Sequence, residues 1–118
     1  MFRLNEQLTV WLHRDAIDFR KNINGLAALV QHEFGRDPFA CALYVFTNRR
    51  RDRVKILGWE RNGFWLLHKR LEKDRFVWPR RCPQQVVELT VQQLHWLLDG
   101  IDLAAMQGHR ELRALRAA

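Results

Sequence analysis

The sequence predicts an α+β fold: a single domain with an antiparallel β-meander of about four strands, an N-terminal helix and a C-terminal helix. Three observations lead to this prediction. The 118 residues suit one hydrophobic core and are too few for two. Apolar residues recur at helical spacing in a region on each side of the centre. The central region is instead rich in β-branched and aromatic residues joined by short polar connections.

The N-terminal part predicts a strand followed by a helix. Residues 8–12 include β-prone Thr, Val and Trp, which make this stretch a candidate first strand. Asp15 is expected to cap a helix, because apolar residues recur at spacings of three and four from Phe19 to Phe34. Gly35 and Pro38 are expected to end that helix.

The central part predicts the meander. Its four candidate strands are residues 42–47, 53–59, 63–71 and 75–78. Asn62-Gly63 favours a tight turn between the second and third of them. All connections are short, and a parallel crossover needs a dozen residues or more, so we expect antiparallel pairing throughout.

The C-terminal part predicts a second helix. It follows a looser apolar stretch that begins at Val86, and Thr90 is its expected cap. Gly100 weakens or ends it. The core therefore spans about residues 8–102, and residues 103–118 form a helical or partly disordered tail.

The positive charge is concentrated in one third of the chain. The sequence has 20 Lys and Arg against 13 Asp and Glu, a net charge of +7. Twelve of the basic residues and only four of the acidic ones lie between positions 48 and 81. A local positive field attracts polyanions, and bound nucleic acid gains further from counterion release. The alternative is an ordinary solvated surface.

Antiparallel topology predicts where these cations gather. The first and third connections of a meander share one end of the sheet, so the Arg49–Arg51 loop should lie beside the turn at Lys73. Arg61, Arg80 and Arg81 should lie at the opposite end. We therefore predict nucleic-acid binding by Arg49, Arg50, Arg51, Arg53, Lys55, Lys69, Arg70, Lys73, Arg75, Arg80 and Arg81.

Eight of the thirteen aromatic residues lie in or beside the meander. Exposed aromatics among basic residues are one way to bind single-stranded nucleic acid. Most of these side chains are expected in the core, because a sheet covered by helices needs large apolar residues. Trp59 and Trp65, near the expected turn, are the best candidates for exposure.

Enzymatic motifs are absent from the sequence. There is no serine, which excludes Ser-His-Asp catalysis, and no phosphate-binding glycine motif. The histidines lack zinc-binding spacing. Asp52, Glu72 and Asp74 share one predicted end and leave open a weak metal site of a nuclease, although each has a basic neighbour. We expect no enzyme activity and no cofactor.

The composition also gives an expected location. Cys41 and Cys82 have no CxxC spacing and are expected to be reduced, packed thiols of a cytoplasmic protein. The chain has no run of 18 apolar residues, so we expect no membrane span. The N-terminus lacks the apolar core of a secretion signal.

Several motifs resemble the TnpB-type accessory proteins of insertion-sequence family sixty-six. They are DPF at 37–39, FTNRRRDRVKIL at 46–57, Trp59, KRLE at 69–72 and RFVWP at 75–79. The segments DFRKNINGLAAL and LTVQQLHWLLDGID extend the similarity over residues 18–102. Gly58, Glu60, Asp74, Asn22 and Asn24 depart from the pattern, and Asp74 replaces a turn glycine.

The resemblance implies a non-catalytic protein that assists a separate transposase of a bacterial mobile element. Its expected partners are DNA and that transposase. Three hypotheses follow: DNA binding through the arginines, an adaptor that binds the transposase without touching DNA, and, third, a metal-dependent nuclease.

Overall fold

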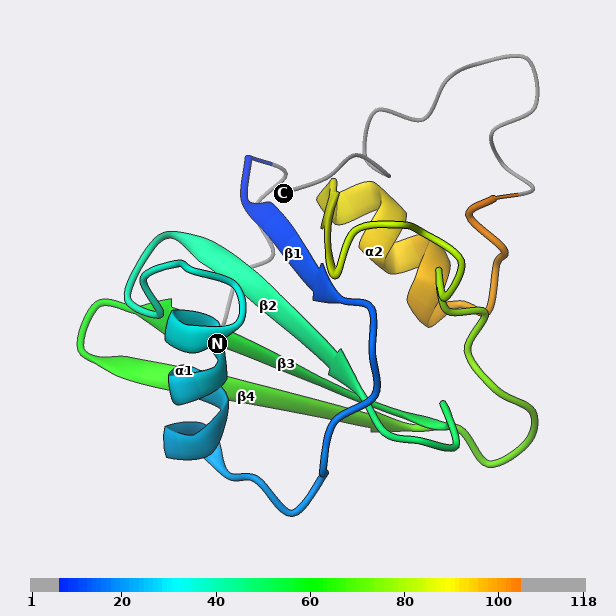
Figure 1. The fold of residues 1–118 in the computed structure, drawn as a ribbon, viewed down its shortest axis with the longest axis horizontal. Coiled ribbons are helices and arrows are strands. Elements are labelled where there is room, and N and C mark those ends of the chain that lie inside the picture. The colour runs from blue at the N-terminus through cyan, green and yellow to red at the C-terminus, as the bar shows by residue number, and fades with distance from the viewer. Residues whose placement is uncertain (1–6, 105–118) are drawn as a thin grey trace.

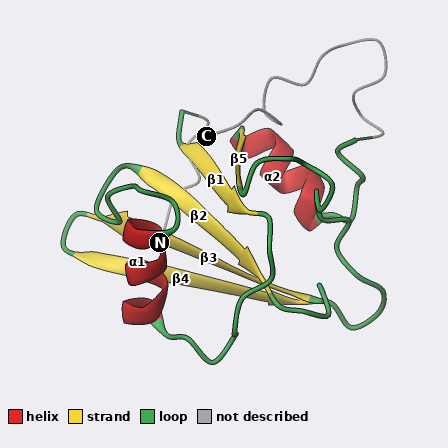
Figure 2. Cartoon of the chain, in the orientation of Figure 1, coloured by secondary structure: helices red, strands yellow, loops and turns green. Residues whose placement is uncertain are grey.

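A five-stranded mixed sheet organises the chain in the computed structural model, which describes residues 7–104. The strand order is β4-β3-β2-β1-β5, and Figures 1 and 2 show the helices packed against this sheet. In chain order the elements are β1 (Thr9–His13), α1 (Ile23–His32), β2 (Ala42–Thr47), β3 (Arg53–Glu60), β4 (Gly63–Arg70), β5 (Val86–Leu89) and α2 (Val91–Leu98).

The predicted α+β fold and its two helices are confirmed, but the sheet is more than a meander. Only β2, β3 and β4 form consecutive antiparallel pairs. β1 lies parallel to β2, because α1 and its connections supply the long crossover that parallel strands need. β5 then pairs antiparallel with the other side of β1 and becomes an edge strand.

The two helices cover opposite faces of the sheet. β2 is buried along its whole length, and alternate residues of a strand point to opposite faces. Tyr44 and Phe46 pack in the core that contains Leu26 of α1. Leu43 and Val45 pack instead in the core that contains Leu94 of α2. The strands between these helices therefore carry near-continuous apolar sequence.

The first helix begins later than predicted. Its N-cap is Asn22, whose side chain accepts a hydrogen bond from the backbone of Gly25, whereas Asp15 was expected in this role. Asp18 is held outside the helix by a bidentate contact with Arg20. Gly35 adopts a left-handed φ of 63° after the helix, which agrees with its predicted role.

The predicted cap of α2 is confirmed. The Thr90 hydroxyl accepts from the backbone N–H of Gln93, and the Gln93 side chain accepts from the backbone N–H of Thr90.

The predicted tight turn between β3 and β4 is also confirmed, one residue earlier than expected. Glu60 pairs with Gly63, and Arg61 takes the left-handed φ of 55°.

Residues 75–78, predicted as the fourth strand, are not a strand. Phe76 and Trp78 are buried against the α2 side of the sheet. The alternation of buried and exposed residues in this segment therefore reflects how an irregular segment packs. Asp74 has a φ of 66°, a backbone turn that directs the chain away from β4. The actual neighbour of the meander is β1, and the fifth strand is formed by residues 86–89.

The C-terminal boundary also differs. Leu103 is 2% exposed and belongs to the core, although it was expected in the tail. The rest of that predicted tail, from residue 105, lies outside the described residues. Within residues 7–104, no helix has the length and apolar character needed to span a membrane.

Candidate functional site

The loop between β2 and β3, residues 48–52, is held in a fixed shape by Asn48. The Asn48 side-chain oxygen accepts from the backbone N–H groups of Asp52 and Arg53, each at 3.2 Å. Its Nδ2 donates to the Asp52 carboxylate at 2.7 Å. Arg51 completes the loop with a left-handed φ of 59°. The exposed Arg49 and Arg50 are thus presented by an ordered turn.

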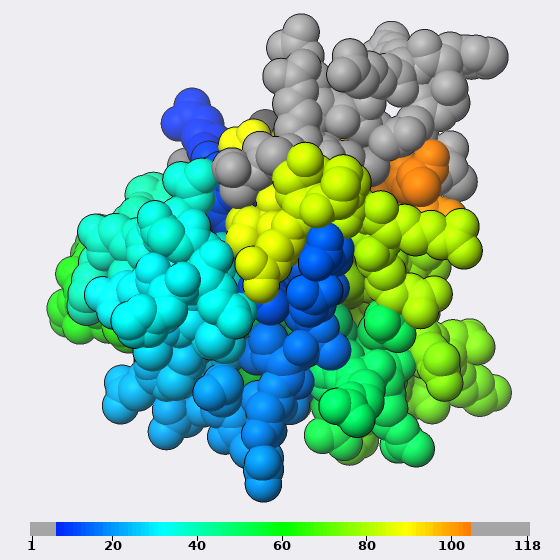
Figure 3. All heavy atoms as spheres, viewed as in Figure 1, coloured from blue at the N-terminus to red at the C-terminus, as the bar shows by residue number. Residues whose placement is uncertain are grey.

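The segment that follows β4 lies beside this loop. The backbone N–H of Leu71 donates to the carbonyl of Asp52, and that of Phe76 donates to the carbonyl of Arg51, both at 2.8 Å. In Figures 1 and 3 the two segments lie together at the lower right, where green and lime atoms meet. The prediction that the first and third connections share one end of the sheet is therefore confirmed.

The positive charges of Arg75 and Arg80 both act on Arg51, and the backbone bond from Phe76 to Arg51 holds this segment beside the loop; we call Arg51, Arg75 and Arg80 the arginine cluster. Arg51 is half-buried, and no described residue accepts a hydrogen bond from its buried Nε. Burial lowers the pKa of Arg51, and the positive charges of Arg80 and Arg75 lower it further. Its immediate electrostatic surroundings are thus positive.

The position of Arg80 corrects the sequence analysis, which placed it with Arg61 at the opposite end. That expectation assumed that residues 75–78 cross the sheet as a strand. Because the segment is irregular, Arg80 remains close enough to Arg51 to repel its charge. Arg81, placed with Arg61 by the same argument, follows Arg80 in the wall of a pocket described below.

Three of the predicted site residues have structural contacts instead. Lys55 Nζ donates to the carbonyls of Phe19 and Lys21, at 2.8 and 3.0 Å. Lys69 Nζ donates to the carbonyl of Leu98 at the end of α2, at 2.8 Å. Arg70 pairs with the Glu72 carboxylate at 3.0 Å. Lys55 and Lys69 hold the layers of the fold together, and Arg70 is partly neutralised.

The remaining predicted residues are exposed on this side of the sheet or next to it. Arg53 lies opposite Arg70 in the register of β3 and β4, which places two cations at one strand end. The exposed residues are Arg49, Arg50, Arg53, Lys73, Arg75, Arg80 and Arg81. We call this set, together with Arg51, the cationic rim.

Carboxylates near the rim do not form a cluster. The hydrogen bond from Asn48 lowers the pKa of Asp52 and keeps this carboxylate ionised within its own loop. Glu72 is paired with Arg70. Among residues 7–104, no three His, Cys, Asp or Glu side chains come together as a possible metal site.

Of the eight aromatic residues in or beside the meander, Tyr44, Phe46, Phe76 and Trp78 are buried in the core, and Phe64 is partly buried against it. Trp59 packs against Phe39 and Phe64 with ring centroids at 4.8 and 4.9 Å. Trp65 is 38% exposed and matches the prediction, whereas Phe39, at 53%, is more exposed and was not singled out. These rings lie near the Arg61 turn, at the other end of β3 and β4 from the cationic rim.

The cysteines correct one expectation. Both are free thiols, and Cys82 is partly buried. Cys41 is exposed instead of packed, because it lies in the connection that precedes β2.

The fold and the site together describe a small α+β protein with a rim of exposed cations at one end of its sheet. The chain belongs to the family described as IS66 Orf2 like protein, whose model matches residues 8–108. This membership links it to insertion sequences and transposition, and the resemblance seen in the sequence is confirmed.

Two similar proteins come from Sinorhizobium fredii. The protein y4jC is 30% identical over 95 residues, which cover 80% of each chain. The protein y4hO is 31% identical over 102 residues, 86% of this chain and 88% of the relative. Both are named only as uncharacterized proteins. No solved structure matches the chain.

Proposed function

We propose that this protein assists transposition by binding DNA through the cationic rim, and that it does so without catalysis. The observation that carries the proposal is the arginine cluster. Arg51 has a buried Nε without an acceptor among the described residues, and the positive charges of Arg75 and Arg80 act on it. Such a group is stabilised when an external anion supplies the missing acceptor and the missing charge.

DNA phosphate suits this geometry. Arginine presents a planar fork of donors that matches phosphate oxygens. The ordered loop at Asn48 holds Arg49 and Arg50 next to the cluster, so several phosphates can be contacted without ordering a flexible segment first. Contacts of this kind position a protein on DNA and carry little sequence information.

The test is a DNA-binding titration at several salt concentrations, with wild-type protein and two single variants. Arg50→Gln removes a charge from the cationic rim. Arg61→Gln removes the same charge from the opposite turn. We expect the logarithm of affinity to fall linearly with the logarithm of salt, by about 0.9 per phosphate contact on duplex DNA. Arg50→Gln should reduce that slope by about one contact.

Two results would contradict the proposal. One is a binding constant that does not change with salt. The other is equal weakening by Arg50→Gln and Arg61→Gln, since that would make the rim irrelevant. If the protein instead captures its transposase after nuclease digestion and retains no DNA, the adaptor hypothesis replaces this one.

A further inference from the structure

A pocket of about 470 Å³ lies next to the arginine cluster. Its walls are mainly apolar and come from the segment that follows Phe76 and from the end of the described chain. The lining residues are Val77, Trp78, Pro79, Arg80, Arg81, Cys82, Pro83, Asp102, Leu103 and Ala104. No pattern in the sequence indicates this pocket, because residues 77–83 and 102–104 come together only in the folded chain.

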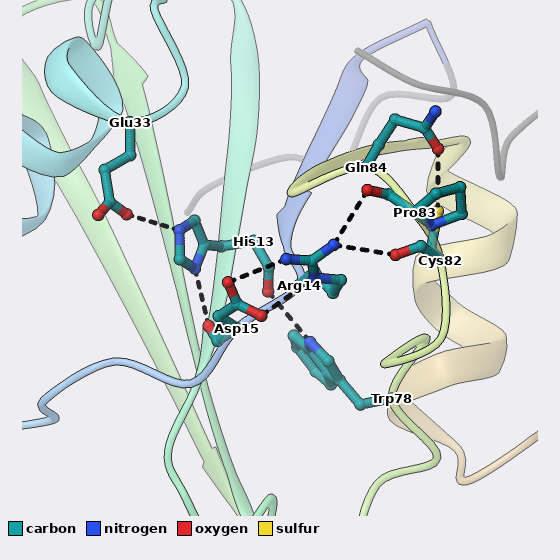
Figure 4. Close-up of polar contacts among 8 residues, drawn as sticks. All are labelled: His13, Arg14, Asp15, Glu33, Trp78, Cys82, Pro83 and Gln84. Atoms are coloured by element: carbon teal, nitrogen blue, oxygen red, sulfur yellow. Dashed lines mark hydrogen bonds and ion pairs between the residues drawn. The ribbon is translucent and has the colours of Figure 1, made fainter.

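Hydrogen bonds to the end of β1 hold one wall of the pocket in place (Figure 4). Arg14 Nη1 donates to the carbonyls of Cys82 and Pro83, at 3.0 and 3.1 Å. The indole N–H of Trp78 donates to the carbonyl of His13 at 3.1 Å. Arg14 is itself held by the Asp15 carboxylate, at 3.0 Å. These contacts therefore fix the wall formed by Trp78, Cys82 and Pro83.

Arg80 joins the pocket to the arginine cluster. It lines the pocket, and its charge is also felt by Arg51. Arg81 lines the pocket as well. An apolar hollow with guanidinium groups at its edge has the two features of a nucleotide site: a surface for the flat, weakly polar base and donors for its phosphate.

We propose that this pocket binds the base of an unpaired nucleotide while the arginine cluster holds the adjoining phosphate. The ligand class is single-stranded DNA or the unpaired end of a duplex. The inference rests on the proposed DNA binding and adds a preference to it. Asp102 supports a base over a second phosphate in the pocket, because its carboxylate repels phosphate and can accept from a base amino group.

Charge favours this occupant over the remainder of the chain. Residues 105–118, which continue from the pocket wall, contain three arginines and one glutamate. Their net charge has the same sign as Arg80 and Arg81. A polyanion complements these arginines, and the phosphates on either side of an inserted base would face the cationic rim.

The experiment compares one 20-nucleotide DNA sequence as a blunt duplex and as the same duplex with an unpaired extension that carries 2-aminopurine. Ala104→Phe fills the pocket from an exposed position without changing charge. The matched control is Ala28→Phe, an exposed alanine on α1. Anisotropy gives the affinity, and 2-aminopurine fluorescence reports burial of the base.

We expect wild type and Ala28→Phe to bind the extended DNA about tenfold more tightly than the blunt duplex, as burial of one base provides. Ala104→Phe should lose this preference and the fluorescence change, with unchanged duplex affinity. Two results would overturn the proposed role of the pocket while leaving salt-dependent duplex binding intact. One is equal wild-type affinity for the two DNAs, and the other is a preference for the extended DNA that survives Ala104→Phe.

Absence of salt-dependent binding to either DNA would overturn the proposed function and this inference together. A second assay measures binding of an acidic, leucine-containing peptide. If Ala104→Phe abolishes peptide binding and leaves the affinity for both DNAs unchanged, the pocket binds a protein segment and the nucleotide proposal is overturned.

Discussion

Lys55 shows at the residue scale how a basic block can contain structural residues. Its ammonium group joins β3 to the two carbonyls that precede α1, and it lies 4.8 Å from the centre of the Phe19 ring. Sequence pattern could not separate Lys55 from Arg53, because both are basic residues of one strand. Only the path of residues 15–22 over the sheet, which no local signal encodes, gives Lys55 its acceptors.

Lys55→Met should therefore lower the free energy of unfolding by about 1–3 kcal/mol, because two carbonyls, one of them in a part-buried contact, lose a charged donor. Arg53→Gln, at an exposed position of the same strand, should change it by less than about 0.5 kcal/mol. Urea denaturation measures both. Equal stability of the two variants would show that the Lys55 contacts contribute nothing.

His68 gives a pH dependence. Burial lowers its pKa below the ordinary value of 6.5, and the charges of Lys55, Arg53 and Arg70 lower it further. Above pH 6.5 the histidine is neutral in both folded and unfolded chains. As the pH falls through 6.5 the unfolded chain takes up the proton first, so the free energy of unfolding decreases until the folded pKa is passed.

His68→Gln should remove this part of the pH dependence, and denaturation at pH 7.5 and pH 5 measures it. The quantity to compare is the difference in the free energy of unfolding between pH 7.5 and pH 5 in each protein. A decrease in stability as large in His68→Gln as in wild type would assign the effect to other groups.

At the scale of elements, the sequence predicts those parts whose signals are local. The capping residues of α2 and the three strands of the true meander follow from side-chain pattern and turn chemistry. Residues 75–78 were misread because Phe76 and Trp78 are buried beneath one face while their backbone lacks a strand partner. Pairing of β1 between β2 and β5 depends on contacts distant in the chain, which periodicity does not specify.

Gly35 provides a prediction about the end of α1. Its φ of 63° is unfavourable for any residue with a Cβ atom, although nothing lies within 4 Å of the position that a Cβ would occupy. Gly35→Ala should therefore lower the free energy of unfolding by about 1 kcal/mol through backbone strain alone.

Gly63→Ala is the matched control, because Gly63 has the same open space and does not have a left-handed φ. Thermal denaturation of both variants separates strain from crowding. A larger loss for Gly63→Ala than for Gly35→Ala would refute the strain explanation.

At the scale of the whole molecule, two cores share one sheet. Leu26 is fully buried between α1 and the sheet, and Leu94 is fully buried between α2 and the opposite face. Because β2 contributes to both, we expect the two cores to unfold together.

Leu26→Ala and Leu94→Ala should each lower the free energy of unfolding by about 2–5 kcal/mol, as large-to-small changes in a core do. Each variant should keep a single transition that far-ultraviolet circular dichroism and tryptophan fluorescence report at the same denaturant concentration. Separate transitions in either variant would show that the two faces unfold independently.

The cationic rim is likewise a property of the whole fold. The clustering of Arg49–Arg51 with the end of β4 follows from hairpin topology and was predictable. Arg80 joins them because an irregular segment returns to the same end, which a strand assignment hides.

The central position of β1 has a consequence for synthesis on the ribosome. Its second hydrogen-bonding partner, β5, is made more than seventy residues later, so Val10 and Leu12 reach their final surroundings only after residues 86–89 have been made. A nascent chain that stops before Val86 would present β1 as an uncovered edge, a template for aggregation. Products that terminate before β5 should therefore be insoluble or rapidly degraded, whereas a chain that includes β5 has this edge of β1 covered.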